Sequence, residues 1–312
     1  MIRPRNWVQE TNFRKPLGVL VALILIATAL PASAASWTVR TEPSKLVNGA
    51  PFLVRVRTPS RVSSLSGVWL SHQLIFSFDS GSNTWFALAG TSFETAPGSY
   101  PLEISGQPAG ATSPDHVPSL PPLSFTRKLT VGRGKYPKRP GQLEVPGKFT
   151  APTEEQTREI EESKKIKDET LNRVTPDREW SGNFAEPANA EISDVFGAAR
   201  VFNGKTQSLH LGLDFRVPTG TPVAAMNDGT VLLARPLYFE GDFVVIDHGQ
   251  GLLTLYLHLS EFKVKEGDVV KRGQIIGLSG GTGRATGPHL HVAVRWQGTY
   301  LDPARLTQLA LP

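Results

Sequence analysis

The sequence predicts a mainly β protein with one charged helix between two β-rich regions. Short runs rich in β-branched and aromatic residues, such as FLVRVRT and DFVVIDHG, recur through most of the 312 residues and are separated by Gly, Pro, Ser and Asn. The composition, with 39% hydrophobic and 20% charged residues, is that of a globular protein, and the length suits about two domains. We divide the chain into four sections, at residues 1–34, 36–132, 133–180 and 181–312.

The first section, residues 1–34, has the layout of a secretory signal peptide. The apolar run PLGVLVALILIATAL is followed by the small residues ASA and preceded by four basic residues, Arg3, Arg5, Arg14 and Lys15. The run has about 15 residues, whereas a membrane-spanning helix needs about 20. We expect cleavage after Ala34 and a mature protein that is periplasmic or secreted. Only an uncleaved segment would attach the chain to a membrane.

Charge and cysteine content narrow the classes of partner and ligand. The formal net charge is +5, and four basic residues and one acid within 1–34 account for +3 of it, which leaves about +2. No cluster of Lys and Arg with interleaved aromatic residues appears, so the sequence predicts no nucleic-acid partner. The chain contains no cysteine, so any metal must be held by His, Asp or Glu.

Residues 36–132 predict an immunoglobulin-like β-sandwich. In FLVRVRT, strand alternation places Phe52, Val54 and Val56 on one face and two arginines on the other. Turn residues separate this run from similar ones at intervals typical of a sandwich. The stretch GQPAGATSPDHVPSLPP is too rich in Pro and Gly for regular structure and is expected to be a loop.

Residues 133–180 predict a basic, Pro-rich linker followed by a charged helix. The helix covers TEEQTREIEESKKIKDETLNRV at 153–174, where Thr153 and Gln156 have the spacing of a capping box. Few apolar residues lie in this segment, so the helix can bury only a narrow stripe. This composition favours a solvated spacer. The alternative is a lid over a site in the section that follows.

Residues 181–312 predict a compact, mostly antiparallel β-domain without a convincing helix. Runs such as GTVLLAR, DFVVIDHG and GLLTLYLHL are bounded by turn residues along the whole section. Because each run is short and the turns are close together, neighbouring strands are expected to pair with each other.

Two motifs in this section carry side chains that can hold a metal. In HLGLDF, His210 and Asp214 are four residues apart, and in TGPHLHVAV, His289 and His291 flank Leu290. Residues two apart on a strand share a face, so both imidazoles of the second motif point the same way. His210, Asp214 and one histidine of that pair form the ligand class of a catalytic zinc with an open fourth position. Zinc so held activates water for hydrolysis near neutral pH.

The remaining histidines fall into two groups. His258 ends a strand in LYLHLS, where it either exchanges a proton with the attacked group or is an ordinary surface histidine. His248, in IDHGQG, is interpreted as a hairpin-turn residue. His72 and His116 lie apart in the sequence from other candidate ligands, and we give these last three histidines no role.

The blocks HLGLDF, VVIDHGQGLLTLYLHLS, GGTGRATGPHLHVAV and LDPARL, in this order, resemble the lysostaphin-like (LytM-type) zinc metallopeptidases over about residues 190–308. The resemblance implies that one zinc ion is bound by three residues, His210, Asp214 and His291. It also implies that His258 and His289 are the catalytic histidines. They would move protons and stabilise the oxyanion while a zinc-activated water attacks a peptide carbonyl.

The resemblance further implies a substrate. The expected protein is an exported endopeptidase that hydrolyses peptide cross-links of bacterial peptidoglycan, with D-alanyl-diaminopimelate bonds as its target. The alternative is a non-catalytic relative that binds peptidoglycan or activates another cell-wall hydrolase, but all five expected site residues are present. The glycines of SGGTGRATGP are expected to form one wall of a substrate groove. The domain at 36–132 would hold the enzyme on the wall or on an envelope protein, or restrict access to the groove.

Overall fold

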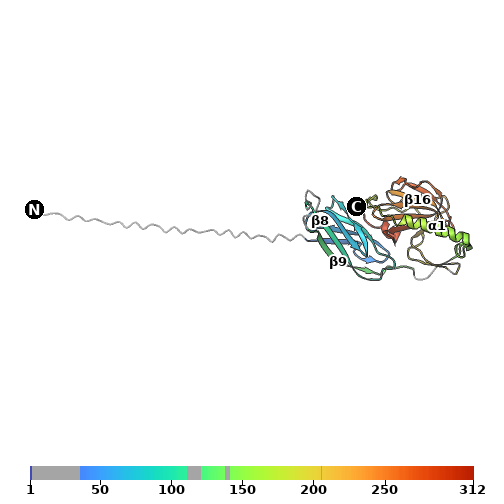
Figure 1. Cartoon of the computed structure of the whole chain (residues 1–312), viewed down its shortest axis with the longest axis horizontal. Coiled ribbons are helices and arrows are strands. Elements are labelled where there is room, and N and C mark those ends of the chain that lie inside the picture. Colours follow the sequence, from blue (N-terminus) through green and yellow to red (C-terminus); the bar gives the residue numbers. More distant parts are fainter. Residues whose placement is uncertain (2–35, 111–120, 138–140, 205) are drawn as a thin grey trace. The chain divides into compact units, whose positions relative to one another are not determined.

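The protein is mainly β, as the sequence predicts (Figure 1). The structure is a computed structural model, and it describes residue 1 and residues 36–110, 121–137, 141–204 and 206–312. Ala35–Pro312 form one compact unit. The predicted signal peptide, apart from its first residue, and His116 lie outside the described residues. In the part of the chain that is described, no helix has the length and hydrophobicity needed to cross a membrane.

The described part of residues 36–132 forms two β-sheets. The first has the order β1 (Thr38–Glu42), β3 (Pro51–Arg57), β7 (Thr84–Gly90), β6 (Ser77–Asp79). The second has the order β2 (Leu46–Val47), β9 (Leu123–Gly132), β8 (Gly98–Pro108), β4 (Val62–Trp69), β5 (His72–Ile75). Strands β1, β3, β7 and β6 and strands β9, β8 and β4 take the places of the two sheets of an immunoglobulin-like sandwich. The strand order therefore agrees with the predicted arrangement.

The two sheets pack through the face that the alternation predicts. Phe52, Val54 and Val56 of β3 are buried, while Arg57 is exposed. The ring of Trp69, from the second sheet, meets Phe52 edge to face at a centroid distance of 5.6 Å. Its indole N–H donates to the Gly90 carbonyl of the first sheet at 2.9 Å. These contacts join the sheets around one apolar core.

Residues from 181 onward form an antiparallel sheet that carries the candidate site. Its main path has the order β11 (Ile192–Asp194), β14 (Leu213–Phe215), β21 (Leu290–Trp296), β18 (Leu252–Phe262), β17 (Gly241–Asp247), β16 (Gly229–Leu237), β19 (Val269–Val270). Three short strands pair beside this path, β15 (Pro222–Ala224), β20 (Ile275–Ser279) and β22 (Thr299–Leu301). The section also holds a short helix that the sequence analysis did not expect, α2 (Pro303–Thr307), which Asp302 caps.

A small second sheet joins the linker to this section. It consists of β10 (Gly141–Leu143), β12 (Ala199–Phe202) and β13 (Thr206–Leu209), and β10 runs parallel to β12. After β10, a 3₁₀ turn at Gly147–Phe149 places the Phe149 ring in a buried cluster with Val145 and Phe202. The linker is therefore packed onto the C-terminal section at this point.

Helix α1 (Glu154–Leu171) begins with the predicted capping box. Gln156 N–H donates to Thr153 Oγ at 3.3 Å, and Thr153 N–H donates to Gln156 Oε1 at 3.0 Å. At the other end, Leu171 is buried in a cluster that includes side chains of β16, β17 and β18, with Ile166 packed against it. Figure 1 shows α1 beside β16. The helix thus lies on the sheet, which favours the lid interpretation over the solvated spacer.

The sandwich contacts the C-terminal section within the same compact unit. Asp302 N–H donates to the Gly49 carbonyl at 2.8 Å, and the His72 ring lies 5.0 Å from the Trp296 ring between centroids. The first contact involves the segment after β21, and the second involves the last residue of β21. The boundaries at 132 and 181 stay a prediction.

Candidate metal centre

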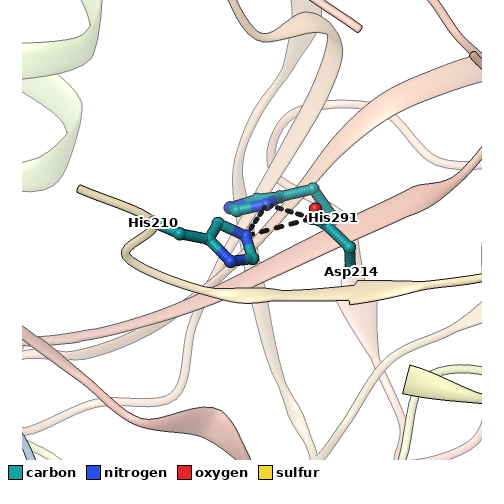
Figure 2. Close-up of side chains that lie close together, drawn as sticks. All are labelled: His210, Asp214 and His291. Carbon is teal, nitrogen blue, oxygen red and sulfur yellow. Dashed lines mark hydrogen bonds and ion pairs between the residues drawn. The ribbon is translucent and has the colours of Figure 1, made fainter. Parts of the chain in front are cut away.

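Three of the predicted site residues converge because of strand register. Asp214 on β14 and His291 on β21 are direct partners across an antiparallel pair. His210 lies just before β14, and its backbone N–H donates to the Ala198 carbonyl at 2.8 Å. Asp214 Oδ1 is 3.1 Å from His210 Nε2 and 2.7 Å from His291 Nδ1, and the two ring nitrogens are 3.0 Å apart (Figure 2).

The chemistry of these atoms fits a divalent metal ion. His210 Nδ1 lies 2.9 Å from the Val195 carbonyl and donates to it, so Nε2 points to the centre with a free lone pair. Burial lowers the pKa of His291 to about 4, so this ring is neutral at pH 7. His210 Nε2, Asp214 Oδ1 and His291 Nδ1 therefore face one another, and the three atoms together carry at most one proton. In tetrahedral zinc sites, ligand atoms about 2.1 Å from the ion are about 3.4 Å apart, close to the distances here.

The two predicted catalytic histidines lie beside these ligands. The His258 and His289 rings have centroids 4.8 Å apart, and the His258 and His291 rings 6.1 Å. His289 Nε2 is 3.8 Å from Asp214 Oδ1. As predicted, His289 and His291 share one face, while Leu290 between them is fully buried on the other. One cluster thus contains all five predicted side chains.

Carbonyl groups orient both of these rings. His258 Nδ1 donates to the Thr282 carbonyl at 2.8 Å, and His289 Nδ1 donates to the Gly287 carbonyl at 2.8 Å. In the neutral form of each ring, Nε2 is therefore the nitrogen that can accept. Burial, together with the neighbouring histidines, lowers the pKa of His258 to about 3, so the ring is neutral over the whole physiological range.

The backbone at His258 departs from the sequence prediction. The strand does not end there, because β18 continues to Phe262. His258 has a φ of 61° at an irregularity in the pairing of β17 with β18, and its N–H donates to the Glu240 carbonyl at 2.9 Å. A non-glycine residue in the left-handed region is strained, and such strain concentrates at functional sites. The irregularity turns the ring toward the ligands.

Comparison with known proteins assigns this region to a family. The family model "Peptidase family M23" matches residues 208–303, which contain all five histidine and aspartate side chains of the cluster. Residues 208–303 form a domain of peptidase family M23. Figure 2 therefore shows three side chains of an M23 domain.

Individual relatives share this domain. The chain is 56% identical over 82 residues to Peptidoglycan DD-endopeptidase ShyA of Vibrio cholerae serotype O1. This match covers 26% of this chain and 19% of that protein. It is 44% identical over 136 residues to DD-carboxypeptidase/endopeptidase Mpg of Neisseria meningitidis serogroup B, which covers 43% of this chain and 31% of that one. The matches thus span less than a third of either relative.

One solved structure extends the likeness beyond the M23 domain. A putative peptidase M23 from Pseudomonas aeruginosa superposes with a TM-score of 0.63 at 27% identity, and the match covers 84% of this chain and 95% of the other. This coverage includes more than the M23 domain and the linker together, so the likeness extends into the sandwich.

A cavity of about 200 Å³ opens beside the candidate metal ligands of the M23 domain. His210, His258 and His291 line it, together with Lys167 of α1 and Glu240. Lys167 Nζ lies 2.5 Å from Glu240 Oε1 in a half-buried ion pair. Helix α1 thus supplies part of the cavity wall, whereas no described residue of 36–132 lines the cavity.

Arg200 is a site residue that the sequence analysis did not single out. Its guanidinium donates to Asp214 Oδ2 and, at 2.6 Å, to Asp194 Oδ2. The metal-facing carboxylate is therefore held from behind, as outer partners of metal ligands usually are. Burial favours the protonated form of Asp214, but the adjoining imidazoles of His210 and His291 hold its pKa well below the ordinary value. Arg200 ends the run FGAAR at residues 196–200, but its position in the sequence alone does not indicate a role.

The other described histidines lie away from the cluster, as expected. His248 follows β17 at the hairpin, and it is fully buried. Its Nδ1 donates to the Asp228 carbonyl at 2.6 Å, and its Nε2 lies 2.8 Å from Thr254 Oγ. His72 belongs to β5 of the sandwich. Neither ring has a nitrogen directed at the metal ligands.

Proposed function

We propose that the chain is an exported zinc metalloendopeptidase that hydrolyses peptide cross-links of bacterial peptidoglycan. The observation that carries the proposal is the convergence of His210 Nε2, Asp214 Oδ1 and His291 Nδ1 beside two further imidazoles, at the wall of a cavity that His210, His258 and His291 line. Three protein ligands with room for a fourth are typical of catalytic zinc and not of structural zinc. A zinc ion at these atoms would supply Lewis-acid activation of a carbonyl and of water.

The two histidines beside the proposed ligands perform the proton transfers. His258 Nδ1 donates to the Thr282 carbonyl, so Nε2 is the ring atom that can accept a proton from the attacking water. His289 is held in the same way by Gly287. Once protonated, an imidazole donates a hydrogen bond to the oxyanion and then passes the proton to the leaving amine. No carboxylate other than the ligand Asp214 is needed.

The proposed substrate is the D-alanyl-diaminopimelate cross-link. The relatives that support it are named a peptidoglycan DD-endopeptidase and a DD-carboxypeptidase/endopeptidase. Export follows from the predicted signal peptide at 1–34, and the proposed location is the periplasm or the outside of the cell. The sandwich, which does not line the cavity with any of its described residues, is proposed to hold the enzyme on the wall or on an envelope protein.

Mass analysis of fragments released from purified peptidoglycan tests this function. The mature protein with one equivalent of zinc should convert cross-linked dimers into monomers with a new D-alanine carboxyl group. Chelation should stop the release, and zinc should restore it. A zinc-loaded protein that releases no fragments, but raises the rate of a second cell-wall hydrolase, would establish the activator function instead.

A further inference from the structure

Arg284 is a cation of the cavity whose guanidinium forms no ion pair with any described residue. It lies in the glycine-rich loop before β21 and lines the cavity with His210, His258 and His291. Lys167 is paired with Glu240 there, and Arg200 is paired with two aspartates. The Arg284 guanidinium, by contrast, forms no ion pair or hydrogen bond with any residue that the structure describes.

Two aromatic rings hold this guanidinium in place. Its central carbon lies 4.6 Å from the Phe202 ring centroid and 4.7 Å from the Phe239 ring centroid. Contacts of this kind use the face of the guanidinium and leave its N–H edge free to donate. Behind the rings, Phe149 of the linker lies 6.1 Å from Phe239 between centroids and shares a buried cluster with Phe202. The site is therefore rigid before a ligand binds.

The loop can approach the β16–β17 turn only because both sides carry glycine. Gly283 has a φ of 71°, and a Cβ atom there would lie 2.3 Å from Gly241 N. Gly241 has a φ of 64°, and a Cβ atom there would meet Thr282. The Arg284 N–H then donates to the Phe239 carbonyl at 2.9 Å. The same loop supplies the Thr282 carbonyl to His258, so it positions a proton acceptor and a cation together.

We propose that Arg284 binds a carboxylate of the peptide substrate next to the scissile amide. An arginine presents a planar pair of donors that matches a carboxylate, and it does so at low entropic cost when its plane is already fixed. In a D-alanyl-diaminopimelate cross-link, the carbon bonded to the scissile nitrogen carries a free carboxylate. Arg284 would therefore select cross-links with this charge over cross-links in which it is amidated. This inference rests on the proposed function.

The test compares two soluble cross-linked dimers that differ only in whether this carboxylate is free or amidated. The zinc-loaded mature protein should cleave the free dimer with a kcat/KM about 10 to 100 times higher, the range expected for one charge-assisted hydrogen bond. Arg284→Gln should remove this preference by slowing the free dimer and leaving the amidated one within about threefold. Arg284→Lys should keep part of it, because it retains the charge and loses the planar donor pair.

Arg216→Gln is the matched control, because Arg216 has a 71% exposed side chain and does not line the cavity. It should leave both rates unchanged. Equal cleavage of the two dimers by the unaltered protein, or an equal loss on both in Arg284→Gln, would overturn the carboxylate assignment and leave the endopeptidase function standing. Cleavage of neither dimer would instead contradict the function. Binding of the two dimers to zinc-loaded His258→Ala, measured by calorimetry, should show the same preference without turnover.

Discussion

The sandwich and the M23 domain have β cores of the same kind, but they bury different polar groups. The buried polar side chains among the described sandwich residues are Asn48, Thr84 and Thr91, and none of them ionises near neutral pH. The M23 domain buries six Asp, Glu and His side chains, which are His210, Asp214, Glu240, Asp247, His248 and His258. Because burial of an ionisable group is costly unless it is compensated, this contrast separates a region built for stability from one built around a site.

Burial alone, however, does not identify the site histidines. His248 is as buried as His258, but both of its ring nitrogens have protein partners. Among the described residues, His258 has one hydrogen-bond partner, at Nδ1, and its side chain lines the cavity. The property that distinguishes a site histidine is therefore a ring nitrogen without a hydrogen-bond partner among the described residues, on a side chain that lines a cavity.

Removal of a metal ligand should have the largest effect. In Asp214→Ala or His210→Ala, the zinc content of the purified protein should fall from about one equivalent to a trace, because only two ligands remain. Peptidoglycan cleavage should be lost with it. Zinc is measured by mass spectrometry of the metal, and His72→Ala of the sandwich is the control that should keep both. Full zinc occupancy in Asp214→Ala would rule out the ligand set.

His258→Ala should separate chemistry from metal binding. His258 Nε2 is not among the three converging ligand atoms, so zinc occupancy should stay near one equivalent. Turnover should fall by about 10² to 10⁴, the usual contribution of a general acid-base group. The measurements are zinc content and kcat on a soluble cross-linked dimer. If the variant loses its zinc, His258 is a ligand and its proposed role is wrong.

The sequence predicted the features of the site that depend on local properties, which are the residue types and the direction of side chains along a strand. His289 and His291 point the same way because of the two-residue period of a strand, and Leu290 between them enters the core. The residue types grouped His210, Asp214 and one histidine of the pair as a candidate zinc ligand set, but the choice of His291 came only from the family resemblance, since a spacing of four residues in a loop has no fixed geometry. In the structure, the pairing of β14 with β21 brings Asp214 and His291 together.

Features that depend on distant contacts were not predictable. The positive φ of His258 depends on a pairing irregularity between β17 and β18. The role of Arg200 depends on Asp214, 14 residues away. The role of Arg284 depends on the Phe202 and Phe239 rings, which come from two other segments. The mainly polar composition of helix α1 favoured a spacer role, but Leu171 and Ile166 at its end suffice to pack it against the sheet. A narrow apolar stripe can thus decide where a charged helix lies.

Protonation of His248 should make the M23 domain sensitive to acid. Burial lowers the pKa of His248 to about 4, below its ordinary value of 6.5, so between these pH values the unfolded chain binds a proton that the native protein does not. The free energy of unfolding therefore falls as the pH drops from 6.5 to 4, by up to about 3 kcal/mol for this group. Urea unfolding of metal-free protein at several pH values measures it.

His248→Gln isolates this contribution from those of the site histidines, which titrate in both proteins. The variant is expected to be less stable at pH 7, because Gln cannot reproduce both hydrogen bonds of the ring. Its stability should nevertheless decline less between pH 6.5 and 4 than that of the parent. Parallel declines in the two proteins would show that His248 does not titrate in this range.

The smallest effects should come from one substitution made in each region. Thr254 and Thr91 are both fully buried, so the change to Val is equally isosteric. Thr254 Oγ lies 2.8 Å from His248 Nε2 and 3.0 Å from the Tyr256 hydroxyl, whereas Thr91 Oγ has no partner among the described residues. Thr254→Val should cost about 1–3 kcal/mol by leaving buried polar atoms unpaired. Thr91→Val should be neutral or stabilise by up to about 1 kcal/mol, because it removes an unpaired hydroxyl.

Denaturant unfolding of the two variants at pH 7 gives both values on one scale. Similar losses in both would mean that Thr91 also has a polar partner, and the contrast between the two regions would then be one of ionisable groups only. Opposite signs would support the wider difference. In that case the sandwich can lose the Thr91 hydroxyl without a loss of stability. The loss of the Thr254 hydroxyl, outside the cavity of the M23 domain, instead leaves Nε2 of the buried His248 ring without its hydrogen-bond partner.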